Sequence, residues 1–168
     1  MEQQTSPEYN ILKTIFTTHG AEEYTERIDR FLAEIYTIER KSILSVLDET
    51  LPENISKDIK DYLSATKITL THQEEVRSAL TALQQMIRKA RVLSLTMAFM
   101  PTKKMTEKMC GSIKENFGDD VIVELNANPD LIAGAIIVFE GKYIDQSVRK
   151  KLEILFEAKK DEVKKFLQ

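Results

Sequence analysis

The feature that most constrains the fold of this chain is a change in hydrophobic periodicity near residue 90. Before it, apolar side chains recur every three or four residues, which is the spacing of amphipathic helices. After it come short runs rich in valine, isoleucine and leucine, such as residues 92–97 and 121–125, which are typical of strands. The sequence therefore predicts an α+β protein, with an all-helical bundle over residues 1–90 and a small mixed sheet with helices over residues 91–168.

Turn and capping residues divide the first 90 residues into separate helices. A first helix is expected to end at Gly20, and a longer one to follow, with an apolar stripe that continues toward Leu47. Pro52 begins another helix, and Thr71 with Glu74 has the spacing of a capping box before the next. Each predicted helix is apolar on one side only, so the helices are expected to pack as a bundle.

The same signals divide the second half. Thr102 is expected to cap a helix that follows Pro101, and residues 132–139 to form a strand. A turn at Gly141 then leads to a short strand, and Asp145 is expected to cap a final helix. The apolar stripe of that helix consists of Val148, Leu152, Leu155, Phe156, Val163 and Phe166. The sheet is expected to be backed by helices.

Composition sets limits on the class of protein. The chain has 168 residues, of which 42% are hydrophobic, and a net charge of −3, so nothing draws it as a whole to nucleic acid or an anionic membrane. Cys110 is the only cysteine, which excludes an internal disulfide. The N-terminus does not resemble a signal peptide, and no apolar run reaches the ~20 residues of a membrane span. We expect a cytoplasmic protein.

Residues that carry chemistry are few and scattered. His19 and His72 have no cysteine or second histidine at ligand spacing, so no metal site is expected. Cys110 is expected to be a small buried residue rather than a nucleophile. The segment from Gly134 to Lys142 has the wrong spacing for a phosphate loop. The sequence therefore predicts no catalytic residue and no cofactor.

We interpret two further groups of side chains as structural rather than functional. The methionines of residues 97–109 suit either the core or an adaptable partner contact, and we favour the core. They are Met97, Met100, Met105 and Met109. The lysines of residues 103–108 are not interleaved with aromatic residues, so they are taken as a solvated helix face.

The strongest pattern lies between residues 128 and 152. Ile132 and Gly134 enter an apolar strand, although a glycine weakens a strand unless the backbone bulges or is closely approached there. A Gly-x-x-Ile-Asp-x-Ser-x-Arg step then leads into the last helix. Its glycine, aspartate, serine and arginine are Gly141, Asp145, Ser147 and Arg149. We interpret all six residues as structural, and expect Arg149 to pair with a carboxylate or a carbonyl.

At these residues the chain resembles the delta subunit of F-type ATP synthases, which in mitochondria is the oligomycin-sensitivity-conferring protein. The resemblance covers about residues 88–155. The chain departs from the family at Ala133, where a second glycine is usual, at Lys150, and in its helical half, which is shorter than the family's six-helix bundle.

The resemblance implies a noncatalytic stator connector without a cofactor. In the family, the helical bundle binds the alpha subunits of the catalytic head and the C-terminal part holds the b subunits of the peripheral stalk, so membrane association is expected only through the complex. Two alternatives are an E-like peripheral-stalk subunit of a V/A-type ATPase, and a small regulatory or nucleic-acid-binding module that uses the lysines near Lys103. The short predicted helices and Pro52 disfavour the former.

Overall fold

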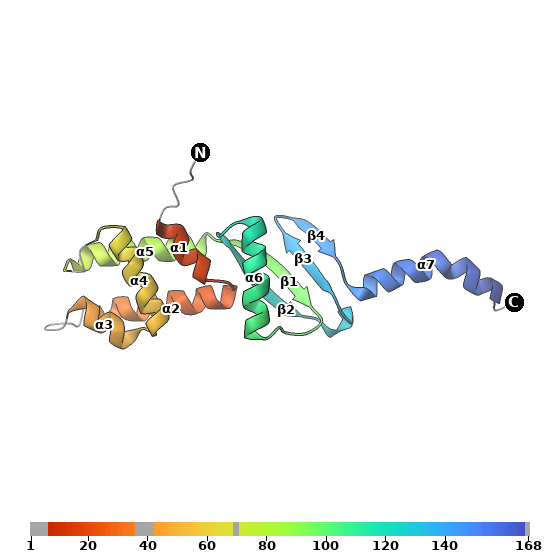
Figure 1. The fold of residues 1–168 in the computed structure, drawn as a ribbon, viewed down its shortest axis with the longest axis horizontal. Coiled ribbons are helices and arrows are strands. Elements are labelled where there is room, and N and C mark those ends of the chain that lie inside the picture. The colour runs from red at the N-terminus through yellow and green to blue at the C-terminus, as the bar shows by residue number, and fades with distance from the viewer. Residues whose placement is uncertain (1–6, 36–41, 69–70, 167–168) are drawn as a thin grey trace, which may run out of the picture.

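The computed structural model describes residues 7–35, 42–68 and 71–166. Figure 1 shows an elongated molecule, with a group of helices at one end, a sheet in the middle and a single helix that projects from the other end. The described residues form seven α-helices and one four-stranded mixed sheet. The predicted α+β class is therefore confirmed.

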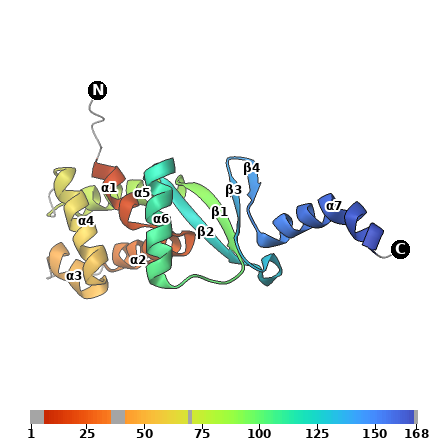
Figure 2. The ribbon, with the colours of Figure 1, turned by 45° about the vertical axis from the view of Figure 1, so that its right-hand side comes forward.

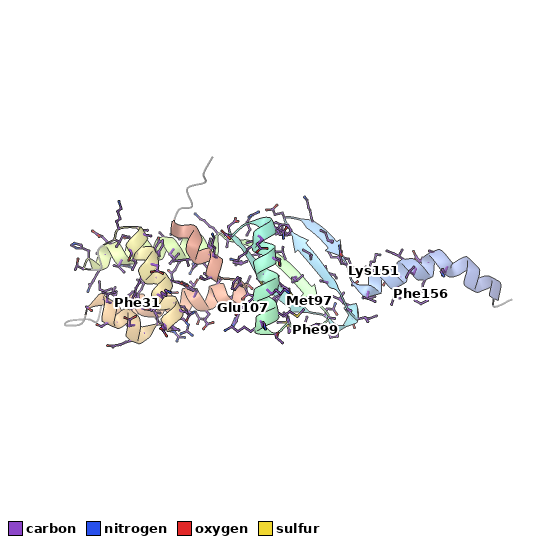
Figure 3. The ribbon with its side chains drawn as sticks, viewed as in Figure 1. Phe31, Met97, Phe99, Glu107, Lys151 and Phe156 are labelled. Atoms are coloured by element: carbon purple, nitrogen blue, oxygen red, sulfur yellow. The ribbon has the colours of Figure 1, made fainter. Side chains whose placement is uncertain are left out.

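Five of the helices precede the sheet and share one core. They are α1 (Pro7–Thr14), α2 (Thr18–Ile35), α3 (Ile43–Thr50), α4 (Glu53–Ala65) and α5 (Gln73–Arg88). Their apolar stripes meet around the fully buried Phe31, Leu47 and Leu63 (Figure 3 labels Phe31). Because each helix is apolar on one side, most of its stability comes from this packing rather than from its own propensity.

The boundary between the first two helices differs from the prediction. Gly20 does not end a helix; it lies in the first turn of α2, and its amide donates to Thr17 Oγ1 over 3.1 Å. The chain leaves the helical path at residues 15–17, where Val123 N donates to Phe16 O over 2.9 Å and Thr17 forms a parallel bridge with Val123. A tertiary contact with a distant strand therefore sets this break.

Two further predictions about the helical half were wrong. Leu47 lies in the separate helix α3, which Ser42 caps by accepting from Ser45 N over 3.2 Å, while residues 36–41 lie outside the described part. The capping box at Thr71 is absent, because α5 begins one residue after His72 and no side chain caps it at that position.

The second half consists of four strands, two α-helices and a short 3₁₀ helix. They are β1 (Arg91–Met97), α6 (Lys103–Phe117), β2 (Val121–Ala127), η1 (Pro129–Leu131), β3 (Ala135–Phe139), β4 (Lys142–Asp145) and α7 (Val148–Phe166). The strand order is β2-β1-β3-β4. Strands β1 and β2 are parallel and connected through α6, whereas β1 with β3 and β3 with β4 are antiparallel.

Helix α6 covers one face of the sheet (Figures 1 and 2). Leu93, Val121 and Val123 form the core beneath it, together with Cys110, which has no exposed surface. The interpretation of Cys110 as a small buried residue is confirmed, and burial raises the pKa of its thiol. Thr102 precedes α6, but its side chain makes no capping hydrogen bond.

The methionine prediction was half right. Met97 is buried in the sheet core and Met109 is partly buried against it. Met100 and Met105 are instead 59% and 41% exposed. Met100 lies in the connection from β1 to α6, and Met105 lies in the first turn of α6.

The final helix also differs from the prediction. We expected helices to back the sheet, but α7 leaves the sheet at its start and extends away from the rest of the molecule in both ribbon views (Figures 1 and 2). Its side chains are exposed from Arg149 to Lys159. The amphipathic pattern of α7 therefore marks a face that no described part of this chain covers.

Candidate partner-binding surface

A tight backbone crossing fixes the start of α7. Gly134 has a φ of +85°, and a Cβ atom built on it would lie 2.4 Å from Gln146 O and 3.0 Å from Ser147 Cα. On either side of this contact, Gln146 N donates to Ala135 O and Val148 N donates to Ala133 O, both over 2.9 Å. Glycine is required here because two backbone segments meet where a side chain would be.

Polar side chains complete the entry to α7. Ser147, which has no exposed surface, precedes the helix, and its Oγ accepts from Lys150 N over 3.1 Å. Asp145 was expected to cap the helix directly, but its Oδ1 accepts from Ser147 N over 2.9 Å. Hydrogen bonding to the side chain of Ser147, and then to its backbone amide, lowers the pKa of Asp145. The serine is therefore the cap, and the aspartate orients the serine.

The other residues of the predicted motif lie apart from this crossing. Gly141 has a φ of +76° in the β3–β4 turn, with nothing near its Cβ position. Arg149 pairs with Glu153, Nε to Oε1, over 3.5 Å on the exposed surface. Ile132 was placed in a strand, but it precedes β3, has a φ of +66° and is 63% exposed. Leu131 is the residue buried at this position.

Large apolar side chains are exposed along α7 and the neighbouring hairpin. Leu152, Leu155 and Phe156 are 39%, 56% and 70% exposed and fall on one side of the helix. On the hairpin, Tyr143 and Ile144 of β4 are 63% and 47% exposed. Figure 3 shows Phe156 and Lys151 on the part of α7 that stands clear of the sheet. Large apolar side chains exposed along one side of a helix are typical of an interaction site.

The helical half offers a different surface. A shallow groove of about 460 Å³ runs along α5. It is lined by Glu74, Arg77, Ser78, Thr81, Ala82 and Gln85. Its small side chains allow another backbone to approach closely, and its two charged residues, Glu74 and Arg77, lie toward the start of α5.

Arg91 is a structural residue that the sequence analysis did not single out. Its guanidinium donates to both carboxylate oxygens of Asp120 over 2.7 and 2.8 Å, to Glu140 Oε1 over 2.8 Å and to Phe117 O over 2.7 Å. These contacts raise the pKa of Arg91 and lower that of Asp120. They tie the end of α6 to the β3–β4 turn. The signal in the sequence was an arginine at the predicted boundary and an acidic turn 29 residues later.

The described residues contain no group of three or more potential metal ligands. His19 and His72 are exposed and lie at the starts of α2 and α5. None of the helices described here is both long and apolar enough to cross a membrane.

Comparisons with known proteins point to one family. The family model described as ATP synthase delta (OSCP) subunit matches residues 10–158. Subunits named ATP synthase subunit delta from two strains of Rhodopseudomonas palustris are 25% identical over 124 residues, which is 74% of this chain and 66% of theirs. One from Francisella tularensis subsp. mediasiatica is 24% identical over 119 residues, 71% of this chain and 67% of its own.

The chain thus spans about two thirds of the length of these relatives. The family match includes both the helices before the sheet and the crossing at Gly134. This chain therefore belongs to the ATP synthase delta (OSCP) subunit family.

Proposed function

We propose that this protein is a noncatalytic stator connector of a rotary F-type ATP synthase, which joins the catalytic head to the peripheral stalk. The observation that carries the proposal is α7. Its apolar face is exposed along Leu152, Leu155 and Phe156, and the crossing at Gly134 holds its first turn. A helix presented in this way suits a partner helix that packs along the same stripe.

We assign the two ends of the molecule to different partners. The exposed face of α7 and the β4 residues beside it would bind the b subunits of the peripheral stalk. The helical half would bind the alpha subunits of the head, and the groove along α5 supports this assignment because its small side chains suit a closely packed partner helix. In this arrangement the protein would be cytoplasmic and peripheral to the membrane, held there only through the complex.

The α7 assignment can be tested with two substitutions that differ only in the face they occupy. Leu155 and Ile154 are both 56% exposed, but Leu155 lies in the apolar stripe and Ile154 on the other side of the helix. We expect Leu155→Glu to weaken binding to purified b subunits about tenfold or more, because a charge replaces a buried leucine at the interface. Isothermal titration with the full chain measures this change.

Ile154→Glu is the control, because it adds the same charge at the same exposure. We expect it to leave the affinity within about a factor of two, as surface substitutions away from an interface usually do. Equal loss with both variants, or no loss with either, would contradict a b-subunit interface on this stripe. Failure of the full chain to co-purify with alpha or b subunits from membranes would overturn the stator proposal itself.

A further inference from the structure

A cleft of about 710 Å³ lies between the two halves of the molecule. Its walls come from the end of α1, the start of α2, the start of α4 and the first turns of α6. The apolar part of the wall includes Ile15, Tyr24, Ile55, Met100 and Leu125. A cleft of this size accommodates a short peptide segment or a drug-sized ligand.

Tyr24, which lines the cleft, carries a buried hydroxyl group that has no partner among the described residues. Tyr24 is 5% exposed, and its OH makes no hydrogen bond to any of the described residues. Burial raises the pKa of Tyr24, and the nearby carboxylate of Asp58 raises it further, so the phenol stays neutral. A buried hydroxyl in this state gains free energy when a ligand supplies a partner.

The charges that line the cleft nearly cancel, with one exception. Arg27 is paired with Glu23, its Nη2 lying 2.6 Å from Oε1. Lys103 and Glu107 are exposed, carry opposite charges and lie one turn apart on α6; Glu107 is labelled in Figure 3. What remains is the carboxylate of Asp58.

Asp58 is a half-buried carboxylate that forms no ion pair among the described residues, although the charge of its neighbour Lys57 partly offsets the effect of burial on its pKa. Its Oδ2 accepts from Thr14 Oγ1 over 3.0 Å, and no lysine or arginine of the described residues forms an ion pair with it. Burial is the main reason why the pKa of Asp58 is raised. A buried carboxylate is stabilised by a cation that brings its own hydrogen-bond donors.

We propose that this cleft binds an arginine or lysine side chain of a partner protein, together with the apolar residues that flank it. The aliphatic stem would contact the apolar wall and the cationic head would reach Asp58, while the phenol of Tyr24 would gain a hydrogen-bond partner. A peptide segment is favoured over a free amine because the cleft is much larger than one basic head group and its walls are largely apolar. The inference does not depend on the stator proposal.

The test uses the full chain, labelled with ¹⁵N, and three probes in NMR titrations. These are acetyl-Leu-Arg-Leu-amide, the same peptide with glutamine in place of arginine, and butylguanidinium. We expect the arginine peptide to shift the amides around the cleft in a saturable way. It should bind about tenfold more tightly than the glutamine peptide, and more tightly than butylguanidinium. Equal binding of the two peptides, or no saturable binding, would overturn the proposal, and tighter binding of butylguanidinium would point to a small-amine site instead.

Three variants distinguish binding in the cleft from binding elsewhere on the surface. Asp58→Asn should weaken the arginine peptide about tenfold, whereas Asp61→Asn, an exposed neighbour on the same helix whose charge acts on Asp58 only through space, should weaken it far less. Tyr24→Phe should weaken it severalfold without lowering the thermal midpoint, because the hydroxyl is unpartnered in the free protein. Equal effects of Asp58→Asn and Asp61→Asn would contradict the site.

Discussion

Gly134 shows how a single residue determines where α7 begins. We expect Gly134→Ala to lower the free energy of unfolding by about 2 to 4 kcal/mol, because the new methyl group meets Gln146 O and the φ of +85° is strained for alanine. Gly111→Ala is the matched control: it lies within α6 with nothing near its Cβ position, so the same change should stabilise by about 0.5 to 1 kcal/mol. Urea denaturation measures the free energy of unfolding of both variants. A loss for Gly134→Ala no larger than about 0.5 kcal/mol would show that the backbone at the crossing shifts to accommodate the methyl group.

Lys114 gives a pH dependence of the opposite sense to that of a lysine whose pKa is raised by a salt bridge. Its side chain is 6% exposed, donates to Leu12 O and, over 3.2 Å, to Asp119 O, and lies 5.5 Å from the centre of the Phe16 ring. Burial lowers its pKa from 10.5 to about 8, against the opposing attraction of Asp119. Between these two pH values the unfolded chain binds the proton more strongly, so this residue makes stability rise as the pH increases from about 8 to 10.5.

The contribution of Lys114 to the free energy of unfolding is expected to rise by about 1 to 3 kcal/mol, since one pKa unit corresponds to about 1.4 kcal/mol. It is read as the difference between the unfolding free energies of the natural chain and Lys114→Met, measured by denaturant titration at each pH. Lys108→Met, an exposed lysine on the same helix, should give no such rise. A difference that is flat or falls over this range would mean that the ammonium is stabilised at its buried position.

At the scale of elements, the sequence predicted those whose signals are local. Helix α4 begins after Pro52 with the expected inward residues Ile55, Ile59 and Leu63, and β1 covers the expected apolar run. Periodicity and turn residues suffice here because the neighbours along the chain decide the structure. The requirement for glycine at position 134 was also visible, because a glycine inside an apolar run is unfavourable unless a backbone comes close.

The remaining elements depend on contacts between distant residues, which periodicity does not encode. The break between α1 and α2 follows from the pairing of Phe16 with Val123. The amphipathic pattern of α7 predicted that one face would be covered, but it did not say whether this chain or another covers it. The same limit applies to the cleft, whose Tyr24 and Asp58 come from helices that are separate in the sequence.

At the scale of the whole molecule, each half contributes a residue to the core of the other. Ile122 of β2 is 4% exposed within the helical core, and Phe16 packs against the sheet core. Lys13 adds an ion pair with Asp119 over 3.2 Å, and Lys114 a hydrogen bond to Leu12 O. The division at residue 90 remains a prediction. These shared contacts favour two halves that unfold together, which suits a connector that must transmit force without bending at its middle.

This coupling yields a prediction that separates one cooperative unit from two independent ones. Ile122→Ala should lower the free energy of unfolding by about 2 to 5 kcal/mol through loss of burial and the cavity left behind. Native-state hydrogen exchange should then show the slowest amides of α5 and of β1 losing the same protection, because both depend on one global opening. Ile144→Ala, at a position 47% exposed on β4, should change neither by more than about 0.5 kcal/mol. Loss of protection in only one of the two elements would mean that the halves open separately, and the rigidity required of the proposed stator connector would have to come from its partners.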